Sequence, residues 1–155
     1  MFGYRKLPED VSSRTQSIHA GQLPSQYMEN AEAIYMTSGF TYGSAEEAEA
    51  AFKGEVERYV YSRYANPTVS MFEERLRLLE GAEACMATGS GMAAVFAALA
   101  CQIGAGERLV ASRALFSSCH VIATQILPRF GVETELVDGT DLNAWEKALS
   151  KPAKI

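Results

Sequence analysis

Two short polar segments of this 155-residue chain combine residue types that can bind an anion. Residues 87–92 (ATGSGM) form a glycine-rich turn before an apolar stretch that is predicted to be helical. A helix start carries free backbone N–H groups and the positive end of the helix dipole, and both favour a phosphate. Gly91 permits close approach of the backbone, and Ser90 adds a hydroxyl donor. The segment indicates either a phosphate site or a tight turn that serves packing only.

The same turn matches the spacing of a dinucleotide-binding fingerprint, with Gly89, Gly91 and Ala94 at the required positions. That fingerprint expects an acidic residue about 20 positions later, where it would hold a ribose at the end of the second strand. The second expected strand ends at Ser112 and Arg113, with no acid there. Arg113 could instead meet the extra phosphate of NADP. An NADP-binding oxidoreductase module therefore stays open as an alternative function.

A second polar segment, residues 61–68 (YSRYANPT), precedes an expected helix. The guanidinium of Arg63 is a planar fork of N–H donors that suits a phosphate, and the phenol of Tyr61 offers another donor. Taken alone, the segment could equally be a solvated loop, because arginine side chains are usually exposed.

Helix signals flank this second segment. Residues 44–47 (SAEE) fit a capping box, which predicts a helix over about 44–53. Asn66 suits an N-cap and Pro67 the first turn of another helix, which Gly81 would end. Four apolar residues of that helix share one face at helical spacing: Val69, Phe72, Leu76 and Leu79.

From residue 84 onward, strand and helix patterns alternate three times. Strands are predicted over 84–88, 108–112 and 132–137, and helices over 92–103, 117–130 and, with Asp141 as N-cap, 142–149. Such alternation indicates a parallel sheet covered by helices. Because three strands leave that sheet incomplete and a further strand is expected to start within 151–155, we expect a truncated domain. The alternative is a small, complete α/β domain.

The overall composition excludes several classes of function. The 14 basic residues are outnumbered by 19 acidic ones, so no broad positive field is available to hold nucleic acid. The first ten residues lack the apolar stretch of a signal peptide, and the longest apolar run, 92–101, is about half of a bilayer span. Cys85, Cys101 and Cys119 are widely spaced, which indicates reduced thiols rather than a disulfide or metal site. We therefore expect a cytoplasmic protein with no membrane partner, no nucleic-acid partner and no metal.

Considered together, the two polar segments resemble the cystathionine γ-synthase-like family of Cys/Met metabolism enzymes, which depend on pyridoxal 5′-phosphate (PLP). YSRYANPT is similar to a hallmark of that family, and ATGSGMAA at 87–94 is similar to its phosphate-binding turn. The likeness extends over nearly the whole chain, in TQSIHAG at 15–21, in residues 38–55 and in VDGTDLNAWEKAL at 137–149.

This resemblance implies an α/β fold of the fold-type I PLP-dependent transferases (aspartate aminotransferase-like). Residues 1–60 would form an N-terminal arm with a short helix, and residues 61–155 the first half of the large PLP-binding domain. An arm over the first 43 residues also fits their weak periodicity, and its apolar side chains would need a surface to lie on.

The family's cofactor-binding roles carry over to matching positions of this chain. Gly91 and Met92 would donate backbone N–H groups to the PLP phosphate, with Ser90 beside them. Tyr61 and Arg63 would reach the cofactor phosphate of the neighbouring subunit. The resemblance thus implies a homo-oligomer with shared active sites.

An aromatic residue that stacks on the cofactor ring in this family is usually a tyrosine, and Phe116 stands at its place here. A phenyl ring can stack but has no hydroxyl for proton transfer. The stretch 115–119 (LFSSC) resembles the O-succinylhomoserine sulfhydrylases more than the synthases or lyases of the family. The implied reaction makes homocysteine and succinate from O-succinylhomoserine and sulfide, with an amino acid as the small-molecule substrate.

No lysine of this sequence is a candidate for the Schiff base with PLP. All five lysines lie in charged or polar segments or in the tail, so the catalytic lysine is expected downstream of Ile155, and the 155-residue piece alone is expected to be inactive. Three alternatives stay open. One is a cystathionine γ-synthase or γ-lyase of the same family, another the NADP-binding module, and the third a non-catalytic oligomerisation fragment.

Overall fold

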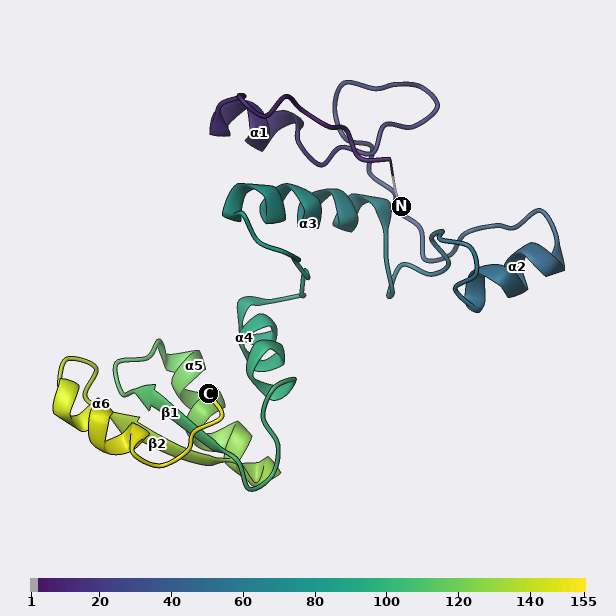
Figure 1. Cartoon of the computed structure of the whole chain (residues 1–155). Helices are drawn as coiled ribbons and strands as arrows, with labels where there is room; N and C mark the ends of the chain where they lie inside the picture. Colours follow the sequence, from purple (N-terminus) through teal and green to yellow (C-terminus); the bar gives the residue numbers. More distant parts are fainter. Residues whose placement is uncertain (1–2) are drawn as a thin grey trace. The chain divides into compact units, whose positions relative to one another are not determined.

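The computed structural model describes residues 3–155, which form two compact units, one up to Ala87 and one over Thr88–Ile155 (Figure 1). The first unit contains α1 (Ser13–His19), α2 (Ala45–Phe52) and α3 (Pro67–Glu80). The second contains α4 (Gly91–Ala100), β1 (Arg108–Ser112), α5 (Ser117–Val121), the π-helical turn η1 (Ile122–Ile126), the 3₁₀ turn η2 (Leu127–Phe130), β2 (Glu133–Val137) and α6 (Leu142–Leu149). The division into an arm over 1–60 and a large domain from residue 61 stays a prediction.

The predicted capping residues start α2 and α3. Asn66 Oδ1 accepts a hydrogen bond from Thr68 N at 2.9 Å, and Ser44 Oγ accepts one from Glu47 N at 3.1 Å. The Glu47 carboxylate accepts from the backbone N–H of Gly43, at 2.6 Å, rather than from that of Ser44 as a full capping box requires. Periodicity does not predict α1, because its sequence SRTQSIH contains a single large apolar residue.

α3 buries a different face from the one that its apolar spacing indicates. The four residues of the predicted face are 36–56% exposed: Val69, Phe72, Leu76 and Leu79. Met71 is buried instead, because the N-terminal segment packs on its side of the helix. There, Arg75 Nε donates to Ala20 O at 3.1 Å, and a Cβ at Gly21 would lie 2.8 Å from Arg75 N.

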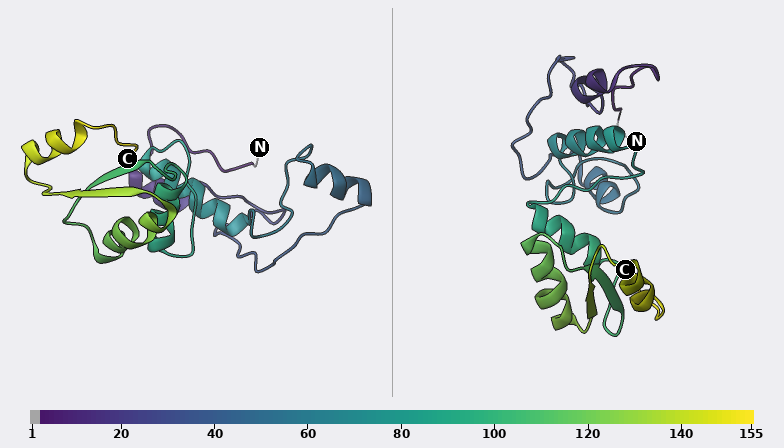
Figure 2. Two further views of the ribbon diagram at one scale, coloured as in Figure 1. Left: turned by 90° about the horizontal axis from the view of Figure 1, so that it is seen from below. Right: turned by 90° about the vertical axis from the view of Figure 1, so that its left-hand side faces the viewer.

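The second unit is built on a two-stranded parallel sheet, in which β1 pairs with β2 from Arg108↔Glu133 to Ser112↔Val137. The views in Figures 1 and 2 place α5 on one face of this sheet and α6 on the other. Each face has its own core. Residues on the α5 side include Leu109, Ile122 and Leu127, and those on the α6 side include Val110 and Ala148. Neighbouring residues of β1 thus face opposite layers, as in the α/β arrangement predicted.

The prediction of a strand over 84–88 is wrong. These residues are neither helical nor part of a sheet, because a strand requires a partner backbone and none of residues 3–155 pairs with this segment. Residues 151–155 are not assigned as a strand, but their backbone makes strand-like hydrogen bonds. Val110 N donates to Ile155 O at 2.9 Å and Lys154 N donates to Arg108 O at 2.8 Å, so the tail pairs with the free edge of β1.

The predicted helix over 117–130 is continuous but irregular, since it passes from α5 into η1 and η2. Leu127 N donates to Ile122 O, as in a π-helix, so the Ala123 carbonyl lacks the partner that an α-helix would give it. The hydroxyl of Thr134, on β2, donates to the Ala123 carbonyl at 2.6 Å. Within this stretch, Ile122 is fully buried, whereas Phe130 is 61% exposed.

Candidate functional site

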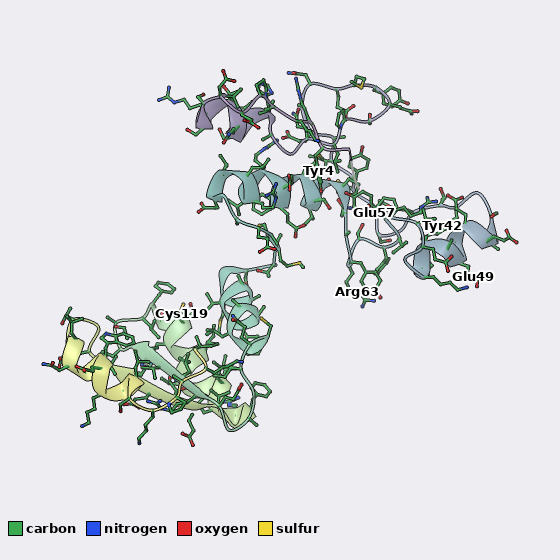
Figure 3. The ribbon with its side chains drawn as sticks, viewed as in Figure 1. Tyr4, Tyr42, Glu49, Glu57, Arg63 and Cys119 are labelled. Atoms are coloured by element: carbon green, nitrogen blue, oxygen red, sulfur yellow. The ribbon has the colours of Figure 1, made fainter. Side chains whose placement is uncertain are left out.

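Tyr61 and Arg63 lie on an exposed turn before α3, and Arg63 points away from that helix (Figure 3). The guanidinium carbon of Arg63 is 5.4 Å from the ring centroid of Tyr61 and 5.4 Å from that of Tyr64. Cation–π attraction therefore holds the side chain between two rings. Within residues 3–155, the contacts found for this guanidinium are with the two rings, so its N–H fork is available to an external anion.

The remaining residues of this segment have structural roles. Asn66 is buried, and its Nδ2 donates to Tyr35 O at 3.0 Å and to Ser62 Oγ at 2.9 Å. Thr68 Oγ1 accepts a hydrogen bond from Tyr35 N at 2.9 Å. The motif YSRYANPT thus has two groups of residues. Tyr61 and Arg63 are exposed, whereas Ser62, Asn66 and Thr68 form hydrogen bonds within the chain. Sequence reasoning identifies Asn66 as a helix cap but misses these further contacts and the contact of Tyr64 with Arg63.

The second candidate segment is the turn that starts α4. Ser90 is the N-cap, and its Oγ accepts from Ala93 N at 3.1 Å, which leaves the hydroxyl hydrogen free to donate elsewhere. Thr88 Oγ1 donates to Ser90 O at 2.8 Å and tightens the turn. The N–H groups of Gly91 and Met92 have no acceptor among the described residues. Three donors therefore converge at the positive end of a helix dipole.

Neither steric crowding nor backbone conformation requires a glycine at positions 89 and 91 of this turn. A Cβ placed on Gly89 or on Gly91 would meet nothing within 4 Å, and neither residue has a positive φ. A site that binds a group from outside the chain would explain both residues, because it needs the backbone to be accessible. This open space and the free donors fit a phosphate.

Phe116 follows β1 and stands at the N-cap of α5, where its ring is 76% exposed. Its neighbour Leu115 packs into the core, so the backbone is anchored while the ring stays outside. α5, which begins directly after Phe116, packs on α4, which begins at the glycine-rich turn. An exposed phenyl ring on an anchored turn can stack on a flat ligand. Ser90, Gly91, Met92 and Phe116 belong to the second unit, and Tyr61 and Arg63 to the first.

Other polar residues have local structural roles. Asp138 Oδ1 accepts from Thr140 N at 3.0 Å and from the Thr140 hydroxyl at 2.8 Å. These bonds, and secondarily Arg113, lower the pKa of Asp138. Asp141 caps α6 by accepting from Asn143 N at 2.9 Å. Asp138 thus follows the end of β2, and Asp141 starts α6, as predicted for Asp141.

Lysines, metal ligands and membrane spans give no further site. The lysines are all exposed, and Lys53 forms an ion pair with Glu49. Residues 3–155 contain no grouping of three His, Cys, Asp or Glu side chains that could hold a metal. In the same part of the chain, no helix has the length and apolar character needed to cross a bilayer.

Solved structures define the class of protein to which this fold and these turns belong. A putative O-acetylhomoserine (thiol)-lyase of Campylobacter jejuni matches with a TM-score of 0.81 and 26% identity, over 89% of this chain and 34% of that one. That protein carries a pyridoxyl-lysine monophosphate at its position 205. The metB protein of Corynebacterium glutamicum gives a TM-score of 0.79 and 26% identity, over 92% of this chain and 36% of its own. The chain has the α/β fold of fold-type I PLP-dependent enzymes.

Sequence relatives define the family. The family model described as "Cys/Met metabolism PLP-dependent enzyme" matches residues 14–155, and the chain belongs to this family. It is 59% identical to an O-succinylhomoserine sulfhydrylase of Mycobacterium tuberculosis, over 97% of this chain and 37% of that protein. It is 39% identical to one of Pseudomonas aeruginosa, over 95% of this chain and 36% of that protein. The chain therefore spans little more than a third of the length of these relatives.

Proposed function

We propose that this chain is the N-terminal part of a PLP-dependent γ-replacement enzyme, which makes homocysteine and succinate from O-succinylhomoserine and sulfide. The observation that carries the proposal is the turn at the start of α4, where free N–H groups and open glycines form a phosphate cup in a chain of this family. The relatives named O-succinylhomoserine sulfhydrylase support the choice of substrate.

In the proposed site, Gly91 and Met92 donate their N–H groups to the cofactor phosphate, and Ser90 adds its hydroxyl. The charge-assisted bonds are favoured by the dipole of α4. The Phe116 ring would stack on the pyridine ring of the cofactor, and because it has no hydroxyl, another group would have to transfer protons. PLP, when bound, supplies an electron sink for the substrate's carbon skeleton. The Schiff-base lysine belongs to a part of the protein downstream of Ile155.

The exposed turn with Tyr61 and Arg63 would complete the phosphate site of a neighbouring subunit. Its support is the free guanidinium of Arg63, which faces away from its own unit. A planar fork of this kind binds phosphate oxygens in pairs. The working protein would accordingly be a cytoplasmic homo-oligomer that acts on a small amino-acid substrate.

A second candidate within the family is a γ-lyase or a cystathionine γ-synthase. It is favoured by the L-methionine gamma-lyase of Treponema denticola, which is 38% identical over 97% of this chain and 38% of its own length. Phe116 favours the sulfhydrylase, as the resemblance of 115–119 implies. The family assignment leaves the NADP-binding alternative without support, and a non-catalytic oligomerisation fragment remains an outcome of the test.

The test uses the complete product of the gene that encodes this sequence. We expect it to bind PLP and to release succinate and homocysteine from O-succinylhomoserine with sulfide, while the 155-residue chain alone is inactive. Gly91→Val should weaken PLP binding at least about tenfold, since its side chain would enter the phosphate space. Gly3→Val is the matched control, because a Cβ there also meets nothing within 4 Å.

Three other results would redirect the proposal. Release of a thiol from methionine without added sulfide would indicate a γ-lyase, and formation of cystathionine with cysteine as acceptor would indicate a synthase. Assembly without PLP uptake would leave only the oligomerisation fragment.

A further inference from the structure

A buried asparagine, Asn66, anchors the segment on which Tyr61 and Arg63 are exposed. Asn66 is 7% exposed and uses both N–H donors, to Tyr35 O at 3.0 Å and to Ser62 Oγ at 2.9 Å. Its Oδ1 accepts from Thr68 N at 2.9 Å. A buried amide with three bonds in three directions has one permitted orientation, so it fixes the groups around it.

Thr68 and Ser62 extend this network to the chain segment 33–38. Thr68 Oγ1 accepts from Tyr35 N at 2.9 Å and donates to Ala33 O at 3.5 Å. Ser62 N donates to Ser38 O at 2.9 Å, and its hydroxyl donates to Thr37 O. We refer to Ser62, Asn66 and Thr68, with their bonds to 33–38, as the Asn66 network.

Apolar packing does not provide the same attachment. Ile34 is 76% exposed and Met36 is 94% exposed, although both lie in the segment that the network holds. The backbone of 33–38 is therefore tied to 62–68 mainly by polar bonds. Removal of one hydroxyl or amide should loosen the attachment without opening a hydrophobic core.

The displayed residues lie within the fastened stretch. Tyr61 pairs with Gly39 through an antiparallel bridge, and Tyr61 O accepts from Tyr64 N at 2.9 Å. Arg63 stands between the rings of Tyr61 and Tyr64, next to Ser62. Its guanidinium is placed by a turn whose two ends are both anchored, one at the bridge and one at Asn66.

We propose that Ser62, Asn66 and Thr68 are positioning residues that preorganise Tyr61 and Arg63 for a phosphate. The inference rests on the proposed function, in which these two side chains bind the PLP phosphate of a neighbouring subunit. A site held in its binding geometry avoids the entropy loss of ordering an exposed turn on binding. Loss of the network should thus weaken recognition of the phosphate group and leave recognition of the pyridine ring unchanged.

The experiment compares PLP with pyridoxal, which lacks the phosphate, on the complete gene product. Dissociation constants are measured at equilibrium for the wild type and for Thr68→Val, which removes one hydroxyl at nearly constant shape. We expect Thr68→Val to weaken PLP binding roughly tenfold and to leave pyridoxal binding unchanged. Thr68→Ser keeps the hydroxyl and should restore wild-type affinity. Asn66→Ala should lose more than Thr68→Val.

Ser44→Ala is the matched control, because it removes the N-cap of α2 and leaves the Asn66 network intact. It should leave both dissociation constants unchanged. Unaltered PLP binding in Thr68→Val overturns the positioning role, and so does an equal loss of PLP and pyridoxal binding, which indicates a general structural defect. If the wild type itself binds PLP no better than pyridoxal, the phosphate cup of the proposed function fails instead. Should Asn66→Ala not fold, the Thr68→Val and Thr68→Ser pair still decides.

Discussion

At the residue scale, the contacts of each candidate side chain distinguish residues that are available to a ligand from residues that hold the chain in place. In the segment 61–68, the contacts of the Arg63 guanidinium with residues 3–155 are with aromatic rings, whereas the polar side-chain atoms of Asn66 hydrogen-bond to its own chain. In the segment 115–119, Leu115 packs inward and Phe116 stays 76% exposed. A sequence motif does not indicate which of its residues bind a ligand. The hydrogen bonds in the structure show which side chains remain available for one.

Phe116 provides a prediction at this scale. If its ring stacks on the pyridine ring, Phe116→Ala should raise the dissociation constant for PLP about twofold to twelvefold, because an aromatic pair contributes about 0.5–1.5 kcal/mol. Phe116→Tyr retains the ring and should bind PLP as tightly as the wild type. Equilibrium titration of the complete gene product measures both. Equal affinities for all three proteins would show that the ring does not contact the cofactor.

At the element scale, packing of the N-terminal segment decides which face of α3 is buried. Arg75 contributes an ion pair with Glu32 as well as its bond to Ala20 O. Gly21 has a φ of +71°, and its α-carbon has no room for a side chain against the α3 backbone. The close approach of these two elements therefore depends on a single residue.

Gly21→Ala tests this contact, with Gly54→Ala as the matched control. Both glycines have positive φ, +71° and +74°, but only at Gly21 would a Cβ collide with backbone, 2.8 Å from Arg75 N. We expect Gly54→Ala to cost about 1 kcal/mol and Gly21→Ala about 2–3 kcal/mol or more. Amide hydrogen exchange of α1 and α3 measures the difference. Equal protection of α3 in the two variants would contradict this packing.

At the scale of the whole molecule, each unit exposes apolar helix surface. α4 (GMAAVFAALA) is apolar on all sides, yet none of its residues is buried. A helix of this composition normally lies inside a protein. The chain spans about 37% of the length of a sulfhydrylase relative.

This surface predicts how the 155-residue chain behaves by itself. We expect it to bind a hydrophobic fluorescent dye strongly and to self-associate as its concentration rises, because exposed apolar patches drive association. The complete gene product should bind little dye and form one oligomer of constant mass. Dye fluorescence and sedimentation velocity measure both properties. A monomeric 155-residue chain that binds no dye would contradict the prediction.

Apart from α1 and the segment 84–88, the sequence by itself determined the local elements, and it indicated the family. Caps such as Ser44, Asn66 and Asp141 place helix starts correctly because a side chain bonds to an N–H group two or three residues away. Residues 108–112 and the segment after Val132 form the predicted strands, since their apolar residues fit a buried sheet. The motifs at 61–68 and 87–94 indicate the family because both resemble its hallmarks and stand at the separation that the family has.

Only the tertiary structure decided which surfaces are covered and which donors stay free. The segment 84–88 is not a strand because strand formation depends on a distant partner backbone. α3 buries Met71 rather than the Phe72 face because the N-terminal segment packs on that side of the helix, which the periodicity of α3 does not predict. The bound amide of Asn66 likewise follows from its contact with Tyr35. Such contacts link positions about 30 residues apart, and local spacing carries no information about them.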